Sequence, residues 1–135
     1  MRQESIVFTN GCFDLLHSGH IHTLSEAADL GDRLIVGLNA DVSVQKLKGE
    51  KRPILNQDQR ARILSALIMV DAIYIFSEET PLSCLEMIKP DFLVKGGDYQ
   101  KEKVVGYDLL TSYGGEVHII PFEEDISTTS ILVKV

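Results

Sequence analysis

The sequence lacks several features that would mark other classes of protein. Its 135 residues contain only two cysteines, and no apolar stretch approaches the roughly 20 residues that a membrane-spanning helix requires. The first five residues lead straight into an expected strand, so no signal peptide is expected. Cys12 and Cys84 belong to no metal-type cluster, and we expect both to be reduced thiols in a cytoplasmic protein.

Positive charge is also scarce. The formal net charge of −7 argues against broad binding to nucleic acid or to an anionic membrane. Of the 13 lysines and arginines, however, four fall within seven positions: Lys46, Lys48, Lys51 and Arg52. This basic segment is either a solvated surface loop or a site for a small polyanion.

Common catalytic and nucleotide-binding signatures are missing as well. The chain has neither the Gly-x-x-x-x-Gly-Lys-Ser/Thr phosphate loop nor the Gly-x-Gly-x-x-Gly dinucleotide fingerprint, so a kinase or a dehydrogenase has little support. Ser18 lacks a Gly-x-Ser-x-Gly frame and Cys12 lacks a partner pattern, so neither is expected to be a nucleophile.

What the chain does contain is a regular alternation of strand and helix patterns. The length and a hydrophobic fraction of 44% favour one domain spanning residues 1–135. Strands are expected at residues 5–9, 33–38, 72–76, 92–94 and 117–120. Helices are expected at residues 20–30, 41–46, 56–68, 81–88 and 104–113, with a last one capped by Ser127 or Thr128. This α/β pattern predicts a Rossmann-like, doubly wound, parallel five-stranded sheet with helices on both faces.

The most informative segment is His17-Ser18-Gly19-His20, which opens a helix after the first strand. Two imidazoles three positions apart can lie on one face of the first helical turn. Free backbone N–H groups and the positive end of the helix dipole there favour phosphate. The alternative interpretation of the two histidines is a zinc site. Zinc needs a third and a fourth ligand, and the sequence does not supply both near this pair, so we expect no metal site built by the protein.

Other polar residues follow the expected strands at the same rim of the sheet, where ligands bind in such folds. Asn39 follows the second strand, Lys95-Gly96-Gly97-Asp98 follows the fourth, and Ser127-Thr128-Thr129 comes after the fifth. Each could be an ordinary turn or cap, but together they favour a ligand site. Arg60, expected on the exposed face of its helix, is either a solvated charge or a phosphate clamp.

Together, these residues resemble the cytidylyltransferase-like superfamily of nucleotidyltransferases, whose signature corresponds to residues 11–20. Residues 8–14, 47–49, 52–53, 93–99, 114–117 and 127–129 are similar to the adenylyltransferases that make ADP-heptose, often fused behind a sugar kinase. The resemblance covers essentially the whole chain and implies a stand-alone form. It also implies transfer of AMP from ATP to D-glycero-D-manno-heptose 1-phosphate, with release of pyrophosphate, for lipopolysaccharide core or other heptose-containing glycans.

The resemblance and this reaction imply roles for individual residues. The expected catalytic residues are His17, His20 and Lys48. The expected nucleotide-binding residues are Asn10, Gly11, Cys12, Phe13, Gly19, Lys46, Lys95, Gly97, Asp98, Ser127, Thr128 and Thr129. The expected acceptor-binding residues are Asp14, Asn39 and Arg60, with Asp14 orienting the acceptor or a metal. Mg²⁺ is expected to arrive mainly on the triphosphate, and a homodimer is common in the family.

Two alternatives remain open. Glycerol-3-phosphate cytidylyltransferase, which uses CTP, shares the His-x-Gly-His and Ser-Thr-Thr elements, but it typically carries Arg-Thr-Glu-Gly before the latter. This chain has Glu123-Glu124-Asp125-Ile126 there, without an arginine. A non-catalytic nucleotide-binding subunit would keep the same fold and phosphate-binding groups, but it would release no pyrophosphate. The sequence does not fix the exact sugar, its anomer or the choice between ATP and CTP.

Overall fold

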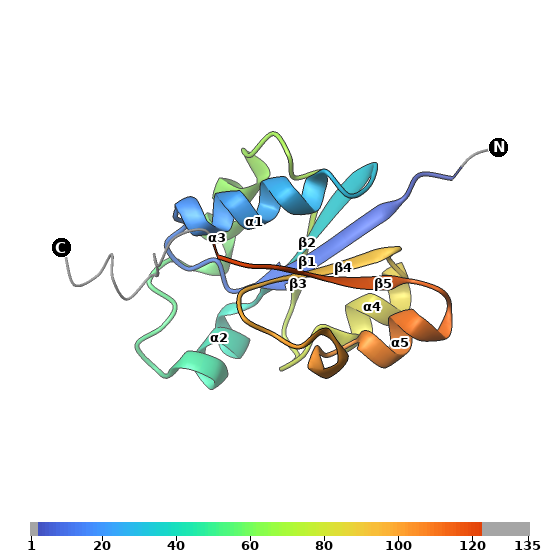
Figure 1. The fold of residues 1–135 in the computed structure, drawn as a ribbon. Helices are drawn as coiled ribbons and strands as arrows, with labels where there is room; N and C mark the ends of the chain where they lie inside the picture. Colours follow the sequence, from blue (N-terminus) through green and yellow to red (C-terminus); the bar gives the residue numbers. More distant parts are fainter. Residues whose placement is uncertain (1–2, 123–135) are drawn as a thin grey trace.

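The computed structural model describes residues 3–122, which build one parallel sheet (Figure 1). Its strands lie in the order β3-β2-β1-β4-β5. They are β1 (Ile6–Gly11), β2 (Arg33–Asn39), β3 (Ala72–Phe76), β4 (Phe92–Gly96) and β5 (Glu116–Ile120). The chain moves outward from β1 to one edge and then returns to add β4 and β5 on the other side, which is the doubly wound order. The predicted fold class is confirmed.

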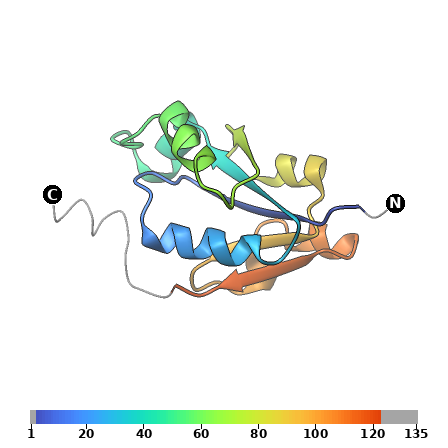
Figure 2. The same ribbon diagram turned by 90° about the horizontal axis from the view of Figure 1, so that it is seen from above.

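Helices cover both faces of the sheet (Figures 1 and 2). On one face lie α1 (Ser18–Ala28) and α3 (Gln57–Ser65); on the other lie α4 (Leu82–Ile88) and α5 (Tyr107–Ser112). A short helix α2 (Asp41–Lys48) follows β2, and a 3₁₀ turn, η1 (Lys101–Lys103), precedes α5.

The two faces hold separate apolar clusters, divided by the sheet. Val7 of β1 packs with Leu24 of α1 and Leu64 of α3, whereas the next residue, Phe8, packs with Leu85 of α4 and Leu110 of α5. Successive side chains of a strand point to opposite faces, so both must be apolar when both faces are covered. That requirement explains the continuous apolar run in β1 that predicted a buried strand.

Several helix boundaries differ from those predicted. Helix α1 begins at Ser18 because His17 caps it, and α2 extends to Lys48 with Ala40, not Asp41, at its N-cap. Helix α3 ends at Ser65, so Ile68 lies beyond it and is 97% exposed instead of extending the apolar stripe. Pro81 is the N-cap of α4 and not its first helical residue. The last predicted helix falls outside the described residues.

The sheet register brings the ends of the central strands together. Thr9 of β1 lies beside Val36 of β2 and Val94 of β4, so the three strands finish at one edge. The order of strands reverses between β1 and β4, which is the switch point where open α/β sheets form a crevice. The fold therefore gathers the segments that follow β1, β2 and β4 into one place.

Candidate active site

A cleft with two adjoining lobes occupies this edge of the sheet. Both lobes are lined by Asn10, Gly11, Cys12, Lys48, Lys95 and Tyr99, which form a shared floor. The small lobe, of about 190 Å³, adds His20 and Thr23 from α1. The large lobe, of about 440 Å³, adds Asn39, Thr80 and Lys103. Three of the four polar clusters predicted for the rim contribute to one cleft.

The two motif histidines are locked together at the start of α1. His17 is the N-cap, and its Nδ1 accepts a hydrogen bond from the Gly19 N–H at 3.2 Å. His20 reaches back, and its Nδ1 accepts from the His17 N–H at 3.1 Å. The rings stack with their centroids 3.8 Å apart. The pair thus forms a capping box, in which each side chain satisfies a backbone donor of the first turn.

This capping geometry fixes the tautomer of both rings. A backbone N–H can only donate, so each Nδ1 must present its lone pair, and a neutral ring then carries its proton on Nε2. Burial, followed by the charges of His17 and Lys48, lowers the pKa of His20 to about 4. Burial also lowers the pKa of His17. At neutral pH the pair therefore offers two Nε2–H donors and no cation.

Positive charge in the cleft comes instead from two lysines on its floor and from Lys103 in the large lobe. Lys48 is the last residue of α2, and Lys95 lies in β4 with its Nζ 5.3 Å from the centroid of the Tyr99 ring. Burial lowers the pKa of Lys95, although the nearby Cys12 opposes this effect. Burial raises the pKa of the Cys12 thiol. A neutral thiol between two lysines fits a binding floor better than a nucleophile.

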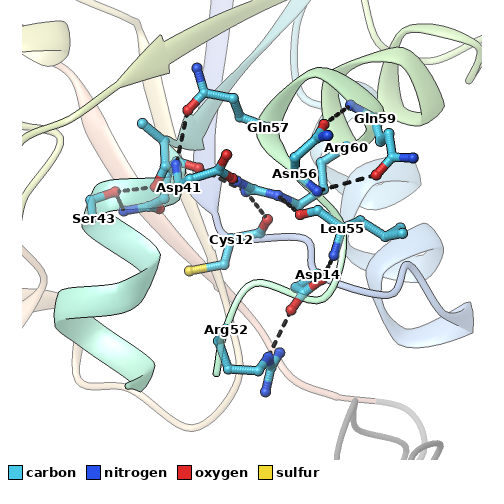
Figure 3. Close-up of polar contacts among 12 residues, drawn as sticks. Cys12, Asp14, Asp41, Ser43, Arg52, Leu55, Asn56, Gln57, Gln59 and Arg60 are labelled. Atoms are coloured by element: carbon cyan, nitrogen blue, oxygen red, sulfur yellow. Dashed lines mark hydrogen bonds and ion pairs between the residues drawn. The ribbon is translucent and has the colours of Figure 1, made fainter. Parts of the chain in front are cut away.

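Asp14 does not have the free carboxylate that its predicted acceptor or metal role requires (Figure 3). It is 1% exposed, and its Oδ2 accepts from Arg52 Nε at 2.7 Å and from the Ile54 N–H at 2.8 Å. Its Oδ1 accepts from the Leu55 N–H at 3.0 Å. Burial alone would raise the pKa of Asp14, but these hydrogen bonds hold it below its usual range. In this structure Asp14 lines the small lobe and anchors the loop between α2 and α3, and its role toward the acceptor or a metal stays a prediction.

Arg60 also differs from its prediction, because it is 1% exposed instead of lying on a solvated helix face. Its Nε donates to the Leu55 carbonyl at 2.9 Å, and its Nη1 donates to the carbonyls of Cys12 and Asn39, both at 2.7 Å. Its Nη2 donates to Asp41 Oδ1 at 2.7 Å (Figure 3). A guanidinium committed to these protein acceptors ties loops together and does not present its fork to an acceptor substrate.

The remaining predicted site residues differ in whether they line the cleft. Asn39 is buried, donates from Nδ2 to Ser43 Oγ at 3.2 Å and lines the large lobe, while Phe13 lines the small one. Four of them are not among the residues that line either lobe: Gly19, Lys46, Gly97 and Asp98. The same holds for the predicted catalytic residue His17. Gly19 supplies the capped N–H of α1. Ser127, Thr128 and Thr129 fall outside the described residues.

The structure adds residues that the sequence argument missed. Thr23 lies one turn after His20, and that helical spacing was a usable signal. A Cβ on Gly96 would lie 2.8 Å from Thr23 Oγ1, so glycine lets β4 approach α1 closely. Glu79, in the loop before α4, and Lys103, in η1, also line the large lobe, and no local pattern marked them.

Within residues 3–122, no group of three or more histidine, cysteine, aspartate or glutamate side chains is placed to hold a metal ion. Over the same residues, no helix is both long enough and apolar enough to cross a membrane.

Comparisons with known proteins show the family to which this chain belongs. A family model described as cytidylyltransferase-like matches residues 8–133. The bifunctional protein HldE of Trichlorobacter lovleyi is 55% identical over 132 residues, and HldE of Geobacter sulfurreducens is 51% identical over 132 residues. Both matches cover 98% of this chain, which spans only 27% of the length of either relative.

Solved structures give the same picture. A lipopolysaccharide core biosynthesis protein from Thermoplasma volcanium is 30% identical, with a TM-score of 0.71 over 92% of this chain and 100% of that one. A pantoate-β-alanine ligase from Francisella tularensis shares 14% identity, with a TM-score of 0.63 over 99% of this chain and 70% of that one. At that identity, the ligase supports the fold alone.

Proposed function

Because the chain belongs to the cytidylyltransferase-like family, we propose that it transfers AMP from ATP to heptose 1-phosphate, forming ADP-heptose and releasing pyrophosphate. The resemblance to this superfamily and to its ADP-heptose-forming members is confirmed. Family membership makes the chain a nucleotidyltransferase domain. The sugar and the nucleotide are the proposed part, since the HldE relatives are much longer than this chain.

The observation that carries the proposal is the cleft with two lobes and one cationic floor. An in-line transfer needs two substrates that meet at one phosphorus atom, and two lobes joined at Lys48 and Lys95 provide that arrangement. We assign the small lobe to the nucleotide, because it contains His20 at the start of α1, where phosphate is favoured. The large lobe is then assigned to the sugar phosphate.

The proposed chemistry needs no proton-transfer residue. The phosphate oxygen of the acceptor is already an anion at neutral pH, and it attacks the α-phosphorus of ATP as pyrophosphate leaves. The protein's contribution is positioning and stabilisation of charge on the transferring group. In this scheme His17 and His20 donate their Nε2–H groups to triphosphate oxygens, and Lys48 neutralises charge as the bond breaks. Proposed further contacts to the triphosphate come from Lys46, Ser127, Thr128 and Thr129.

The lining of the large lobe suits a phosphorylated sugar. Lys103 and the floor lysines can hold a phosphate, and Thr80 and Asn39 offer neutral hydrogen-bonding groups. Glu79 also lines this lobe, and a carboxylate would repel a polyphosphate but accept hydrogen bonds from hydroxyls. We therefore place the hydroxyl-bearing part of the acceptor beside Glu79.

Mg²⁺ fits this cleft only as a companion of the nucleotide. The described residues offer no three-ligand cluster, and the carboxylate of Asp14 already accepts from Arg52 and two backbone groups. We propose that the ion arrives on triphosphate oxygens and supplies charge neutralisation there. We also propose a homodimer, as is common in the family, acting in the cytoplasm where its two thiols stay reduced.

One crossed assay tests the function. Pyrophosphate release is measured with ATP or CTP against heptose 1-phosphate or glycerol 3-phosphate. The expected result is rapid release only with ATP and heptose 1-phosphate. Release only with CTP and glycerol 3-phosphate would establish the cytidylyltransferase alternative. Nucleotide binding without release from any pair would establish a non-catalytic subunit.

A further inference from the structure

Arg52, in the loop between α2 and α3, has an unusual environment for a loop arginine. Its side chain is only 17% exposed, whereas the neighbouring Lys51 is exposed. Its Nε donates to Asp14 Oδ2 at 2.7 Å. Its Nη2 is buried and has no hydrogen-bond partner within residues 3–122. Buried guanidinium nitrogens are normally satisfied, so an unsatisfied one calls for an explanation.

The arrangement around Asp14 explains why Nη2 is left over. In the usual paired geometry, a carboxylate takes two parallel hydrogen bonds from one guanidinium. Here one Asp14 oxygen accepts from Arg52 Nε and the Ile54 N–H, and the other accepts from the Leu55 N–H. The oxygen that Nη2 would share in the paired geometry accepts from the Leu55 N–H, and it has no hydrogen bond from Nη2. Asp14 fixes the guanidinium by one edge and leaves the buried Nη2 donor unpaired among the described residues.

Arg52 is not itself among the residues that line either lobe, and it is related to the nucleotide side of the cleft through Asp14. Asp14, its anchor, lines the small lobe together with His20 and Lys48 and is not among the residues that line the large lobe. Burial raises the pKa of the Cys12 thiol, and the charges of Lys48, Arg60 and Arg52 oppose that effect, so Arg52 lies within electrostatic reach of the cleft floor. An anion in the small lobe is the ligand that a buried cationic donor favours.

We propose that Arg52 is a phosphate-binding residue of the small lobe, donating from Nη2 to an oxygen of the nucleotide triphosphate while Asp14 holds its Nε. This proposal rests on the nucleotide assignment made above. It gives Asp14 a positioning role in nucleotide binding in place of contact with the acceptor. It also makes the guanidinium essential, because a lysine carries the charge but cannot keep both an Asp14 contact and a directed second donor.

The test compares Arg52→Lys and Arg52→Gln with the matched variants Arg62→Lys and Arg62→Gln, since Arg62 is exposed on α3. Dissociation constants for ATP, pyrophosphate and adenosine are measured by calorimetry, and KM is measured for both substrates. Both Arg52 variants should weaken ATP and pyrophosphate by about 10-fold or more, as expected for a hydrogen bond to a charged group. Adenosine binding and the Arg62 variants should be unchanged.

Each other outcome has a definite meaning. A rise only in KM for heptose 1-phosphate would overturn the proposal and assign Arg52 to the acceptor. Unchanged ATP and pyrophosphate binding in folded Arg52 variants would overturn it outright. If neither variant folds, side-chain ¹⁵N resonances of the wild-type protein decide: pyrophosphate should shift those of Arg52, and their constancy would refute the contact. Wild-type protein that binds no ATP would instead refute the proposed function.

Discussion

Replacing His20 tests whether the motif histidines act as neutral hydrogen-bond donors. His20→Ala removes two groups at once: the Nδ1 acceptor for the His17 N–H and the Nε2–H donor. Losing one donor at a developing charge lowers the rate by about 10²–10³-fold. Losing a capping interaction lowers the free energy of unfolding by about 0.5–2 kcal/mol. His20→Ala should show both losses.

His20→Gln separates this explanation from acid–base catalysis. A planar amide carries an acceptor and a donor side by side, as the neutral imidazole does. The chain already uses glutamine in this way, since Gln59 Oε1 accepts from the Asn56 N–H at 3.3 Å in the capping box of α3. We therefore expect His20→Gln to keep the wild-type free energy of unfolding and to recover a large part of the rate lost in His20→Ala.

The assay is steady-state pyrophosphate release, with urea unfolding of each variant in parallel. The expected order of kcat is wild type, then His20→Gln, then His20→Ala. If His20→Gln is folded but as slow as His20→Ala, the imidazole must transfer a proton or carry charge, and the neutral-donor argument is wrong. Wild-type turnover in His20→Ala would remove His20 from the mechanism altogether.

Four further experiments test the protonation of His20, the buried Arg60, the acceptor lobe and the close contact between Gly96 and Thr23. The pKa of His20 is about 4 in the folded protein, below its ordinary value of 6.5, so the imidazole binds a proton more readily in the unfolded chain. The free energy of unfolding, measured by urea titration, should therefore decrease as the pH falls from about 6.5 to about 4. The His20→Gln variant should show a smaller decrease. Arg60→Ala leaves buried acceptors unpaired and should lower the free energy of unfolding by about 3–5 kcal/mol in the same experiment. Glu79→Gln should raise KM for the sugar phosphate by about 10-fold and leave KM for ATP unchanged. Gly96→Ala should lower the free energy of unfolding, measured by urea titration, by about 1–3 kcal/mol, because the new Cβ would lie 2.8 Å from Thr23 Oγ1. Adding Thr23→Ala should restore most of the lost free energy.

The fold could be predicted because its signals are local. Each strand of a covered parallel sheet must be apolar on both faces, as Val7 and Phe8 are, and two of the helices, α1 and α3, begin with a side-chain cap from their own first turn. Asn56 and Gln59 illustrate this, since the predicted capping box is present with the Gln59 N–H donating to Asn56 Oδ1 at 2.9 Å. The histidine pair was equally local, because its partners lie within three residues.

Asp14 and Arg60 could not be placed in this way, because their partners are distant in sequence. Asp14 is bound by residues 38 to 41 positions away, and Arg60 reaches Cys12 across 48 positions. One signal for Arg60 was available: it lies four residues before Leu64, on the buried stripe of α3. The expectation that a charge faces solvent outweighed that spacing, although a buried arginine is tolerated when acceptors satisfy it.

These two buried charges also fix the position of the basic segment, residues 46–52, relative to the cleft. Asp14 and Arg60 hold the loop after α2 at Ile54 and Leu55, against the ends of β1 and β2. A loop fixed this way keeps its cations in place before substrate arrives, which is how preorganised charge lowers a barrier. The segment therefore has two parts: Lys48 lines the cleft and Arg52 is held by Asp14, whereas Lys46 and Lys51 remain on the surface. The polyanion site is the interpretation that we propose for Lys48 and Arg52.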